Sequence, residues 1–310
     1  MEEKIEIMNL LQNKQVLEHE LNSLAYGAVE IRENNSNKYI YVHYREDGVT
    51  LTKYVGEYSD KLYNLILNNS IKAKQIKKQI REITKELKKL NYIEEELNLK
   101  VEQNIDFAKR HLVDTIYKQA ILEGVATTFA DTESIIEGGK VNNMTSEDVM
   151  KIVNLKHAWE FILNKNVILA QTNFALLCEI NKMVEEGFYY TAGKVRNVPV
   201  TIGGTKWVPD LPIESMIKEE LEEIFSKKID DVNKSIELLL YIMKKQIFID
   251  GNKRTAVIFI NHYLISKGKG IIAIPAELTK EFKDLLISYY EGKDEKQIKK
   301  FIKEQCYMGI

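Results

Sequence analysis

The sequence predicts a mainly α-helical protein that contains one small β-meander. Only four of the 310 residues are proline, while Lys, Glu, Leu and Ile are abundant, which favours helices. From about residue 103 to the end, apolar residues recur at helical spacing, with one interruption at residues 189–212. The 45% hydrophobic content supports a buried core, and the length allows one large domain or two smaller ones.

Residues 1–58 are predicted to form a helix followed by three short strands. Apolar residues recur at helical spacing through about the first 25 residues. Turn signals at residues 34–37 and 46–48 then separate runs that are rich in β-branched and aromatic residues. This pattern is typical of an antiparallel meander.

Residues 59–102 are predicted to form a long basic helical arm that begins near Ser59. Its apolar residues fall four and three positions apart, as a heptad-like seam of Ile76, Ile80, Ile83, Leu87 and Leu90. Such a seam has to be buried against the meander, the following domain or a second copy, so a homodimer is one option. Eight Lys and Arg side chains decorate the arm, but Glu82 and Glu86 interrupt them and the net charge of the chain is −2. We therefore interpret the basic face as solvated and do not expect nucleic acid binding.

Several classes of protein are excluded by composition. The two cysteines, Cys178 and Cys306, lie in separate helical stretches, which excludes a disulfide framework and a Cys-rich zinc site. The first residues lack a signal-type apolar core, and no stretch approaches the length of a membrane span. We expect a cytoplasmic protein without a membrane partner.

The stretch QIFIDGNKRTA places a carboxylate, a glycine and two cations directly before an apolar helical run. Free backbone N–H groups and the positive end of the helix dipole meet at a helix N-terminus, which favours anions. Gly251 allows a close backbone approach, and Lys253 and Arg254 suit phosphate oxygens. Asp250 suits a divalent cation that bridges those oxygens. The alternative is that Asp250 and Asn252 only cap the helix while the two cations face water.

Three segments of the sequence resemble motifs of the Fic/Doc family. FIDGNKRTA, within loop 246–254, is similar to the active-site motif, in its Doc-like form with an intact NKRTA. AGKVRNVPVTIGG, within residues 189–212, resembles the family's flap. QAILEGVATTFADTESIIEGG, which begins at Gln119, resembles the segment that carries the inhibitory helix, and the inhibitory-helix-like segment is residues 114–124. The resemblance covers about residues 110–305. It implies that residues 103–310 form a helical Fic fold with a short β-hairpin flap.

The resemblance also implies an activity: transfer of AMP from ATP, with Mg²⁺, to a hydroxyl side chain of a target protein. Phe248 would anchor the loop, and Asp250 would coordinate Mg²⁺ on the phosphates. The anion hole and phosphate grip would come from Gly251, Asn252, Lys253 and Arg254. Asn252 and Arg254 would act in catalysis together with position 246.

The flap is expected to be an exposed hairpin with its turn at Gly203 and Gly204. In the family this segment holds the target protein by strand-like pairing. The residues expected to dock the target are Lys194, Val195, Val200, Thr201 and Ile202.

One departure from the family pattern concerns the catalytic base. Gln246 stands where the family has the histidine that takes the proton from the target hydroxyl, and an amide is not basic near neutral pH. Because general base catalysis contributes about 10²–10⁴-fold, we expect a weakened transferase that still binds nucleotide. The glutamine is either natural or a substitution made to trap a substrate complex. His262 lies about two helical turns beyond Arg254, and His111 and His157 are interpreted as packing or capping residues, so none offers a substitute base.

Other departures concern the phosphate grip and its regulation. Lys253 replaces a glycine, and Doc-like members with this lysine are associated with phosphate transfer. Val257 replaces a second arginine, so Glu123, at the inhibitory position, lacks its expected partner, and Gln119 replaces the motif's Ser/Thr. Glu123 either pairs with Lys253 or is an ordinary helix glutamate. The alternatives to AMP transfer are therefore a Doc-like kinase that transfers the γ-phosphate and a non-catalytic nucleotide-binding regulator.

Overall fold

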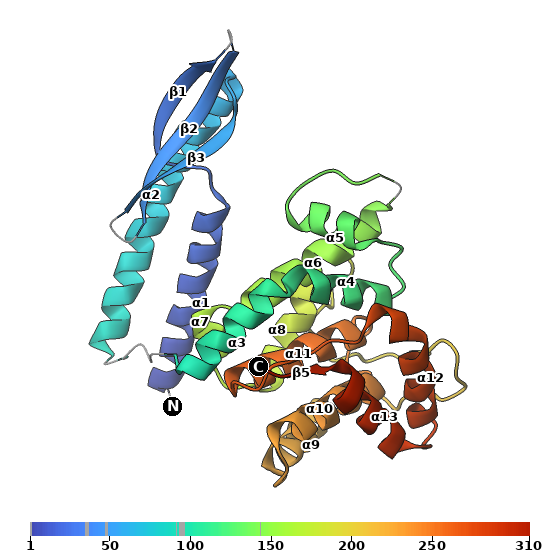
Figure 1. The fold of residues 1–310 in the computed structure, drawn as a ribbon. Coiled ribbons are helices and arrows are strands. Elements are labelled where there is room, and N and C mark those ends of the chain that lie inside the picture. The colour runs from blue at the N-terminus through green and yellow to red at the C-terminus, as the bar shows by residue number, and fades with distance from the viewer. Residues whose placement is uncertain (1, 35–36, 47–48, 91, 93–96, 143) are drawn as a thin grey trace. The chain divides into compact units, whose positions relative to one another are not determined.

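The computed structural model describes residues 2–34, 37–46, 49–90, 92, 97–142 and 144–310. The chain divides into two compact units, Met1–Glu95 and Glu96–Ile310. The mainly helical class with small antiparallel sheets is confirmed (Figure 1). None of the helices in the described residues is both long and apolar enough to cross a membrane.

The N-terminal unit contains two helices and one antiparallel meander, as the sequence predicts. Its elements are α1 (Glu2–Ser23), β1 (Ala28–Asn34), β2 (Asn37–Glu46), β3 (Val49–Glu57) and α2 (Asp60–Lys89). The strand order is β1-β2-β3, and a register shift at Ile40/Tyr41 interrupts the β2–β3 ladder. Ser59 caps α2, because its hydroxyl accepts a hydrogen bond from the Leu62 N–H at 3.2 Å. Alternation along the strands puts Ile40 and Val42 on one face, where they pack against Ile66 of α2.

The seam of α2 is buried inside the N-terminal unit. Ile76 and Leu87 are buried, and the other seam residues are half-buried. Helix α1 packs along α2, and Lys72 of α2 forms an ion pair of 2.6 Å with Glu20 of α1 (Figure 1). The apolar seam of α2 is therefore buried against α1, which was not among the partners expected for this seam.

The C-terminal unit is a helical domain. Its elements are α3 (Leu99–Arg110), α4 (Leu112–Leu122), α5 (Phe129–Ile136), α6 (Ser146–Ile162), α7 (Lys165–Ile168), α8 (Phe174–Val184), α9 (Glu214–Ser226), α10 (Asp231–Lys245), α11 (Asn252–Ser266), β4 (Ile271–Ile272), the 3₁₀ turn η1 (Ala276–Leu278), α12 (Thr279–Tyr290), α13 (Glu295–Phe301), the π-helical turn η2 (Ile302–Cys306) and β5 (Tyr307–Met308). Strand β5 pairs with β4 in an antiparallel ladder.

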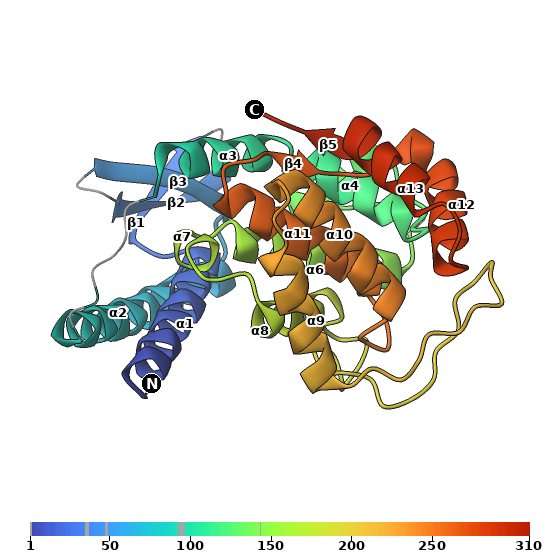
Figure 2. The ribbon, with the colours of Figure 1, turned by 90° about the horizontal axis from the view of Figure 1, so that it is seen from below.

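Helix α11 is the centre of this domain. Every residue from Arg254 to Ile265 is buried, and α3, α6, α7, α8 and α10 all contact this helix (Figure 2). A helix that is apolar on all sides is stable only when other elements surround it. The core thus fixes the position of the α11 N-terminus, where the cationic loop lies.

The predicted flap, residues 189–212, is an extended excursion between α8 and α9 (Figure 2). The expected turn is present at Gly203 and Gly204, but no strand is assigned on either side of it within these described residues. The segment therefore has the outline of a hairpin without a strand ladder. Pro199 and Pro209 supply no N–H donor for such a ladder.

Candidate functional site

The candidate site is the turn that connects α10 to α11. Gln246 ends α10 in the left-handed conformation with φ of 48°, and Gly251 precedes α11 with φ of 71°. A non-glycine residue in this conformation stores about 1–3 kcal/mol and is a frequent feature of functional sites. The space at Gly251 is limited as well, because a Cβ there would lie 2.2 Å from Oε1 of Glu185. The group that lies close to the backbone at Gly251 is therefore the carboxylate of Glu185, a neighbour that the sequence did not indicate.

Asn252 holds the loop in shape. Its Oδ1 accepts a hydrogen bond from the Phe248 N–H at 2.9 Å, and its Nδ2 donates to the Phe248 carbonyl at 2.8 Å. Nδ2 also lies 3.2 Å from Oε1 of Gln246. The side chain expected to contribute to the anion hole is thus committed to the loop. Phe248 is buried, in agreement with its expected role as an anchor.

The amide of Gln246 is held from both sides. Its Nε2 donates to the Met243 carbonyl at 2.7 Å, and its Oε1 accepts from Asn252. Tyr290 of α12 lies close enough to hydrogen-bond with Gln246, and burial raises the pKa of the Tyr290 hydroxyl far above its usual range. Neither group accepts a proton near neutral pH, so no general base is present at this position.

Arg254 is the buried cation of the site, with 2% of its surface exposed. Its Nη2 forms an ion pair of 2.8 Å with Oε1 of Glu185 and lies 3.7 Å from Oδ2 of Asp250. The Nε and Nη1 atoms are buried and make no hydrogen bond within the described structure. An unpaired buried donor on a charged group costs about 1–3 kcal/mol or more, so the arrangement favours an anion that would accept from these nitrogens.

Glu123 ends α4 and faces the same cations. Its Oε2 lies 3.6 Å from Nζ of Lys253 and 3.7 Å from Nε of Arg254, and its Oε1 is buried without a hydrogen bond in the described residues. The structure therefore brings Glu123 into contact with both cations across 130 residues of sequence, whereas the expectation named Lys253 alone.

Glu185 is a site residue that sequence reasoning missed. It follows the last residue of α8, is 2% exposed, and forms the shortest ion pair of Arg254. Burial raises the pKa of its carboxyl to about 7, although Arg254 opposes this shift. The sequence NKMVEE contains only a weak signal, because Asn181 and Glu185 are four residues apart and therefore share one helix face.

Asn181 joins three parts of the site. Its Nδ2 donates to the Asp250 carbonyl and lies 3.1 Å from the Thr255 hydroxyl, and its Oδ1 accepts from the Gly193 N–H at 2.8 Å. It is 1% exposed. One buried amide of α8 thereby connects the loop, the first turn of α11 and the start of the flap.

Arg196 holds the base of the flap against the loop. Its guanidinium donates to the carbonyls of Val198, Asp210 and Gln246, and its backbone N–H donates to the Ile247 carbonyl at 3.0 Å. Burial lowers its pKa from the usual value. The arginine thus ties both sides of the flap to the turn after α10, a role that the AGKVR motif alone did not reveal.

The predicted docking residues of the flap divide into two groups. Lys194 and Thr201 are exposed, whereas Val195, Val200 and Ile202 are half-buried, and of these three Val195 and Ile202 pack against the core. The far end of the flap rests on α12, because Trp207 stacks on Tyr290 with ring centroids 5.3 Å apart. Backbone-to-backbone hydrogen bonds are absent among residues 197–206, all of which the structure describes.

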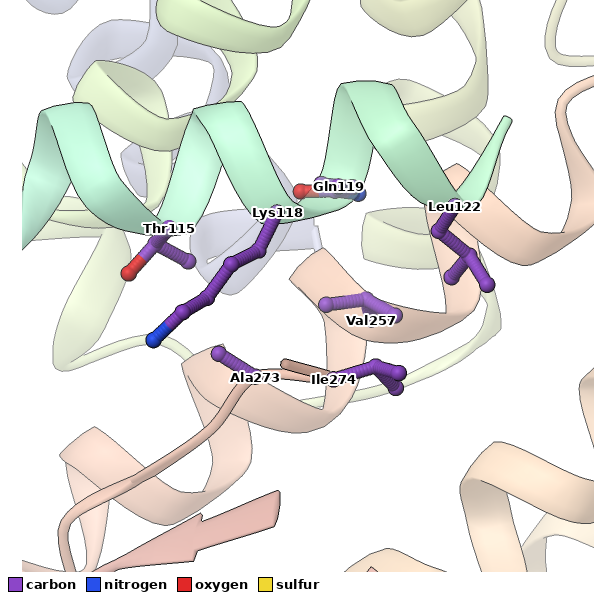
Figure 3. Close-up of a pocket in the computed structure, with 7 residues that line it drawn as sticks. All are labelled: Thr115, Lys118, Gln119, Leu122, Val257, Ala273 and Ile274. Carbon is purple, nitrogen blue, oxygen red and sulfur yellow. The ribbon is translucent and has the colours of Figure 1, made fainter. Parts of the chain in front are cut away.

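A hydrogen bond connects helix α4 to α11 one helical turn before Glu123. Gln119, at the motif's Ser/Thr position, donates to the Arg254 carbonyl at 2.7 Å and accepts from the Trp159 indole at 3.0 Å. Val257, at the second arginine's position, lines a small pocket together with Gln119 and Leu122 (Figure 3). Where the family pattern has a guanidinium, this chain has an apolar contact between α4 and α11.

The residues of the loop fit Mg²⁺ only together with a ligand. No cluster of three or more His, Cys, Asp or Glu that could hold a metal ion occurs in the described part of the chain. The Asp250 side chain is half exposed: its Oδ1 accepts from the Gly251 N–H at 2.7 Å, and its Oδ2 lies 3.7 Å from Nη2 of Arg254. Mg²⁺ is commonly bound by one or two carboxylates plus substrate phosphates, which matches a single available carboxylate.

His262 and His111 make their contacts away from the 246–254 loop. His262 is buried, and its Nε2 donates to the Val167 carbonyl at 2.7 Å while Nδ1 accepts from the Thr172 hydroxyl. Burial lowers its pKa to about 4. His111 ends α3 and packs against the ring of Phe107. Both therefore have structural roles.

The fold and the site define a helical domain built around a cationic loop at a buried helix N-terminus, with an adjoining flap. Residues 171–264 match the sequence model of the Fic/DOC family, and the chain thus carries a Fic/DOC domain. Fic domains form a class of protein-modifying transferases. A search of curated proteins gives no match.

Solved structures of Fic proteins share this fold. A Fic-domain-containing signaling protein from Bacteroides thetaiotaomicron matches with a TM-score of 0.51 and 17% identity, over 62% of this chain and 76% of that one. Fic-1 from C. elegans, residues 134–508, matches with a TM-score of 0.53 and 15% identity, over 78% of this chain and 79% of that one. A Fic family protein from Desulfovibrio desulfuricans matches with a TM-score of 0.53 and 13% identity, over 65% of this chain and 65% of that one. At these identities the likeness concerns the fold alone.

Proposed function

We propose that this protein is a Fic-type nucleotidyltransferase that binds ATP and Mg²⁺ and transfers AMP to a hydroxyl of a target protein, at a rate limited by Gln246. The observation that carries the proposal is Arg254, whose Nε and Nη1 are buried without hydrogen-bond partners beside the α11 N-terminus. Phosphate oxygens would supply the acceptors that these nitrogens lack.

The other loop residues take roles consistent with this ligand. Asp250 would hold Mg²⁺ together with phosphate oxygens, and the bound ion would neutralise charge on the phosphates. Lys253 would add a mobile cationic contact, and Gly251 and Asn252 would keep the loop in its present shape. In the transfer step the target oxygen attacks the α-phosphorus, pyrophosphate leaves, and the hydroxyl proton needs an acceptor. The amide of Gln246 does not accept that proton.

The flap would position the target protein. The backbone groups of residues 197–206 are not paired with one another in the described flap, and the Val198 carbonyl accepts from Arg196. The other backbone groups of this stretch would be available for strand-like pairing with an extended segment. Arg196 and Asn181 hold the base of the flap next to the loop. Glu123 would lower activity by competing with phosphate for Lys253 and Arg254.

Transfer of the γ-phosphate is the second candidate function, because two observations favour it. Lys253 occupies the glycine position, and its Nζ lies 3.6 Å from Glu123 beside the Arg254 guanidinium. Val257 removes a cation from the second arginine position and packs against α4 instead. A nucleotide-binding regulator without turnover is the third candidate, supported by the absence of a base at Gln246.

The test restores the base with Gln246→His and supplies ATP labelled on either the α- or the γ-phosphate. Label from the α position on protein supports AMP transfer, whereas label from the γ position supports a kinase. Gln246→Ala is the matched control, since it also changes the loop but supplies no base. Bound nucleotide with no labelled protein in the Gln246→His variant would reject both transfer reactions and leave the regulator.

A further inference from the structure

The charge around Arg254 is unusual for a phosphate site. Three carboxylates face this guanidinium: Glu185 at 2.8 Å, Glu123 at 3.7 Å and Asp250 at 3.7 Å. Lys253 is the second cation of the cluster, 3.6 Å from Glu123. Because the pKa of the Glu185 carboxyl is raised to about 7, all five groups are ionised only above this pH, where three negative charges face two positive charges and leave an excess of negative charge.

Glu185 contributes most to this excess on physical grounds. It is 2% exposed, whereas the Asp250 side chain is 51% exposed, so solvent and salt screen the charge of Glu185 far less. It also touches the loop itself, since its Oε1 occupies the space next to Gly251. Any anion bound by the free nitrogens of Arg254 therefore experiences this carboxylate at close range.

We propose that Glu185 is a specificity-determining residue that makes the site select metal-bound nucleotide over metal-free nucleotide. The inference rests on the proposed function, because it assumes that polyphosphate binds at Arg254. A metal-free polyphosphate carries several negative charges into a cluster that is already negative. A bound divalent cation supplies the positive charge that the cluster lacks, and Asp250 is positioned to hold it.

A purely structural role for Glu185 makes a different prediction. If the carboxylate only orients Arg254, a glutamine at position 185 can replace it, because its side chain has the same length and retains an oxygen acceptor. The preference for metal-bound over metal-free nucleotide then stays unchanged. If the charge itself matters, the same change strengthens the binding of metal-free polyphosphate selectively. The two roles are therefore separated by the metal dependence of binding.

The experiment measures dissociation constants for ATP and for inorganic tripolyphosphate by titration calorimetry, in Mg²⁺ and in EDTA, at a pH of about 8, where the Glu185 carboxyl is mainly ionised. The wild type is compared with Glu185→Gln and with Glu186→Gln, which changes the neighbouring exposed glutamate. In Glu185→Gln we expect metal-free ATP and tripolyphosphate to bind about tenfold more tightly or better, because a poorly screened unit charge near the phosphates has been removed. Binding of Mg²⁺–ATP is expected to change less than about threefold, and Glu186→Gln to match the wild type.

An unchanged ratio of the dissociation constants in EDTA and Mg²⁺ would overturn the proposal, as would the same increase in Glu186→Gln. If Glu185→Gln does not fold, Glu185→Ala and Glu185→Asp replace it. The alanine variant should then lose the metal preference, and the aspartate variant should keep it. Failure of the wild type to bind Mg²⁺–ATP, with tripolyphosphate bound in EDTA only by Glu185→Gln, would reject nucleotide as the ligand but support the exclusion of metal-free polyphosphate.

Discussion

Two buried arginines, one at the base of the flap and one at the start of α11, differ in how their donors are satisfied. Arg196 and Arg254 are each 2% exposed. The guanidinium of Arg196 donates only to backbone carbonyls, and every nitrogen of it has an acceptor. Arg254 faces carboxylates, yet two of its nitrogens lack a hydrogen bond in the described structure. A satisfied buried cation holds backbone segments together, whereas an unsatisfied one is available to a ligand.

Substitution of each arginine by methionine should separate these roles and gives the largest expected effect. Arg196→Met leaves the carbonyls of Val198, Asp210 and Gln246 without donors, so we expect a loss of about 3–5 kcal/mol in the free energy of unfolding. Arg254→Met should cost only about 1–2 kcal/mol, because the Glu185 carboxyl, with its pKa already raised to about 7, then takes up a proton.

Urea unfolding monitored by circular dichroism measures both variants, with the exposed Lys194→Met as the control. Only Arg254→Met is expected to abolish the binding of Mg²⁺–ATP while the fold is retained. A larger loss of stability in Arg254→Met than in Arg196→Met would contradict the distinction between the two arginines.

His262 extends the comparison to a buried group that is neutral and fully hydrogen-bonded. Its folded-state pKa is lowered to about 4 from the usual 6.5, so between these values the unfolded chain binds the extra proton. Stability should therefore be lost as the pH falls from 6.5 to 4, by about 3 kcal/mol from this residue, and should be fully present above 6.5. The measurement is the pH dependence of urea unfolding for the wild type and His262→Gln, and parallel curves would refute the assignment.

Gly251 tests the contact between the loop and Glu185. Gly251→Ala combines a φ of 71° with a Cβ 2.2 Å from Oε1 of Glu185, and we expect a loss of about 1–3 kcal/mol. In a Glu185→Ala background the steric part of this loss should disappear, so the two substitutions should not be additive. A double-mutant cycle of unfolding free energies measures the coupling. Additive effects would mean that the backbone conformation alone requires glycine.

The smallest effect is expected at the far end of the flap. The Thr205 hydroxyl donates to Glu291 at 2.9 Å and accepts from the Trp207 N–H at 3.1 Å. Thr205→Val should change the global stability by about 0.5–1 kcal/mol at most. Hydrogen exchange should nevertheless accelerate in residues 198–208 and stay unchanged near Arg196. Equal acceleration at both ends of the flap would show that Arg196 does not hold its base independently.

Short-range patterns in the sequence were sufficient to predict the helices, the N-terminal meander and the position of the 246–254 loop. Helical periodicity and turn residues act over a few residues, and they correctly predicted the mainly helical class and the N-terminal meander. The apolar run that follows GNKRTA likewise located α11, because its helical spacing placed the GNKR segment at a helix N-terminus.

Tertiary structure alone decided which side chains meet at that loop. Glu185 pairs with Arg254 across 69 residues, as Asn181 does with Asp250, and Arg196 reaches Gln246 across 50 residues. Nothing in the local spacing of NKMVEE or AGKVR specifies these contacts, because they form only when α8 and the flap pack against α11. The sequence by itself determined a helix N-terminus rich in cations, and the fold determined that carboxylates surround those cations, since burial leaves Arg254 no water to offset its charge.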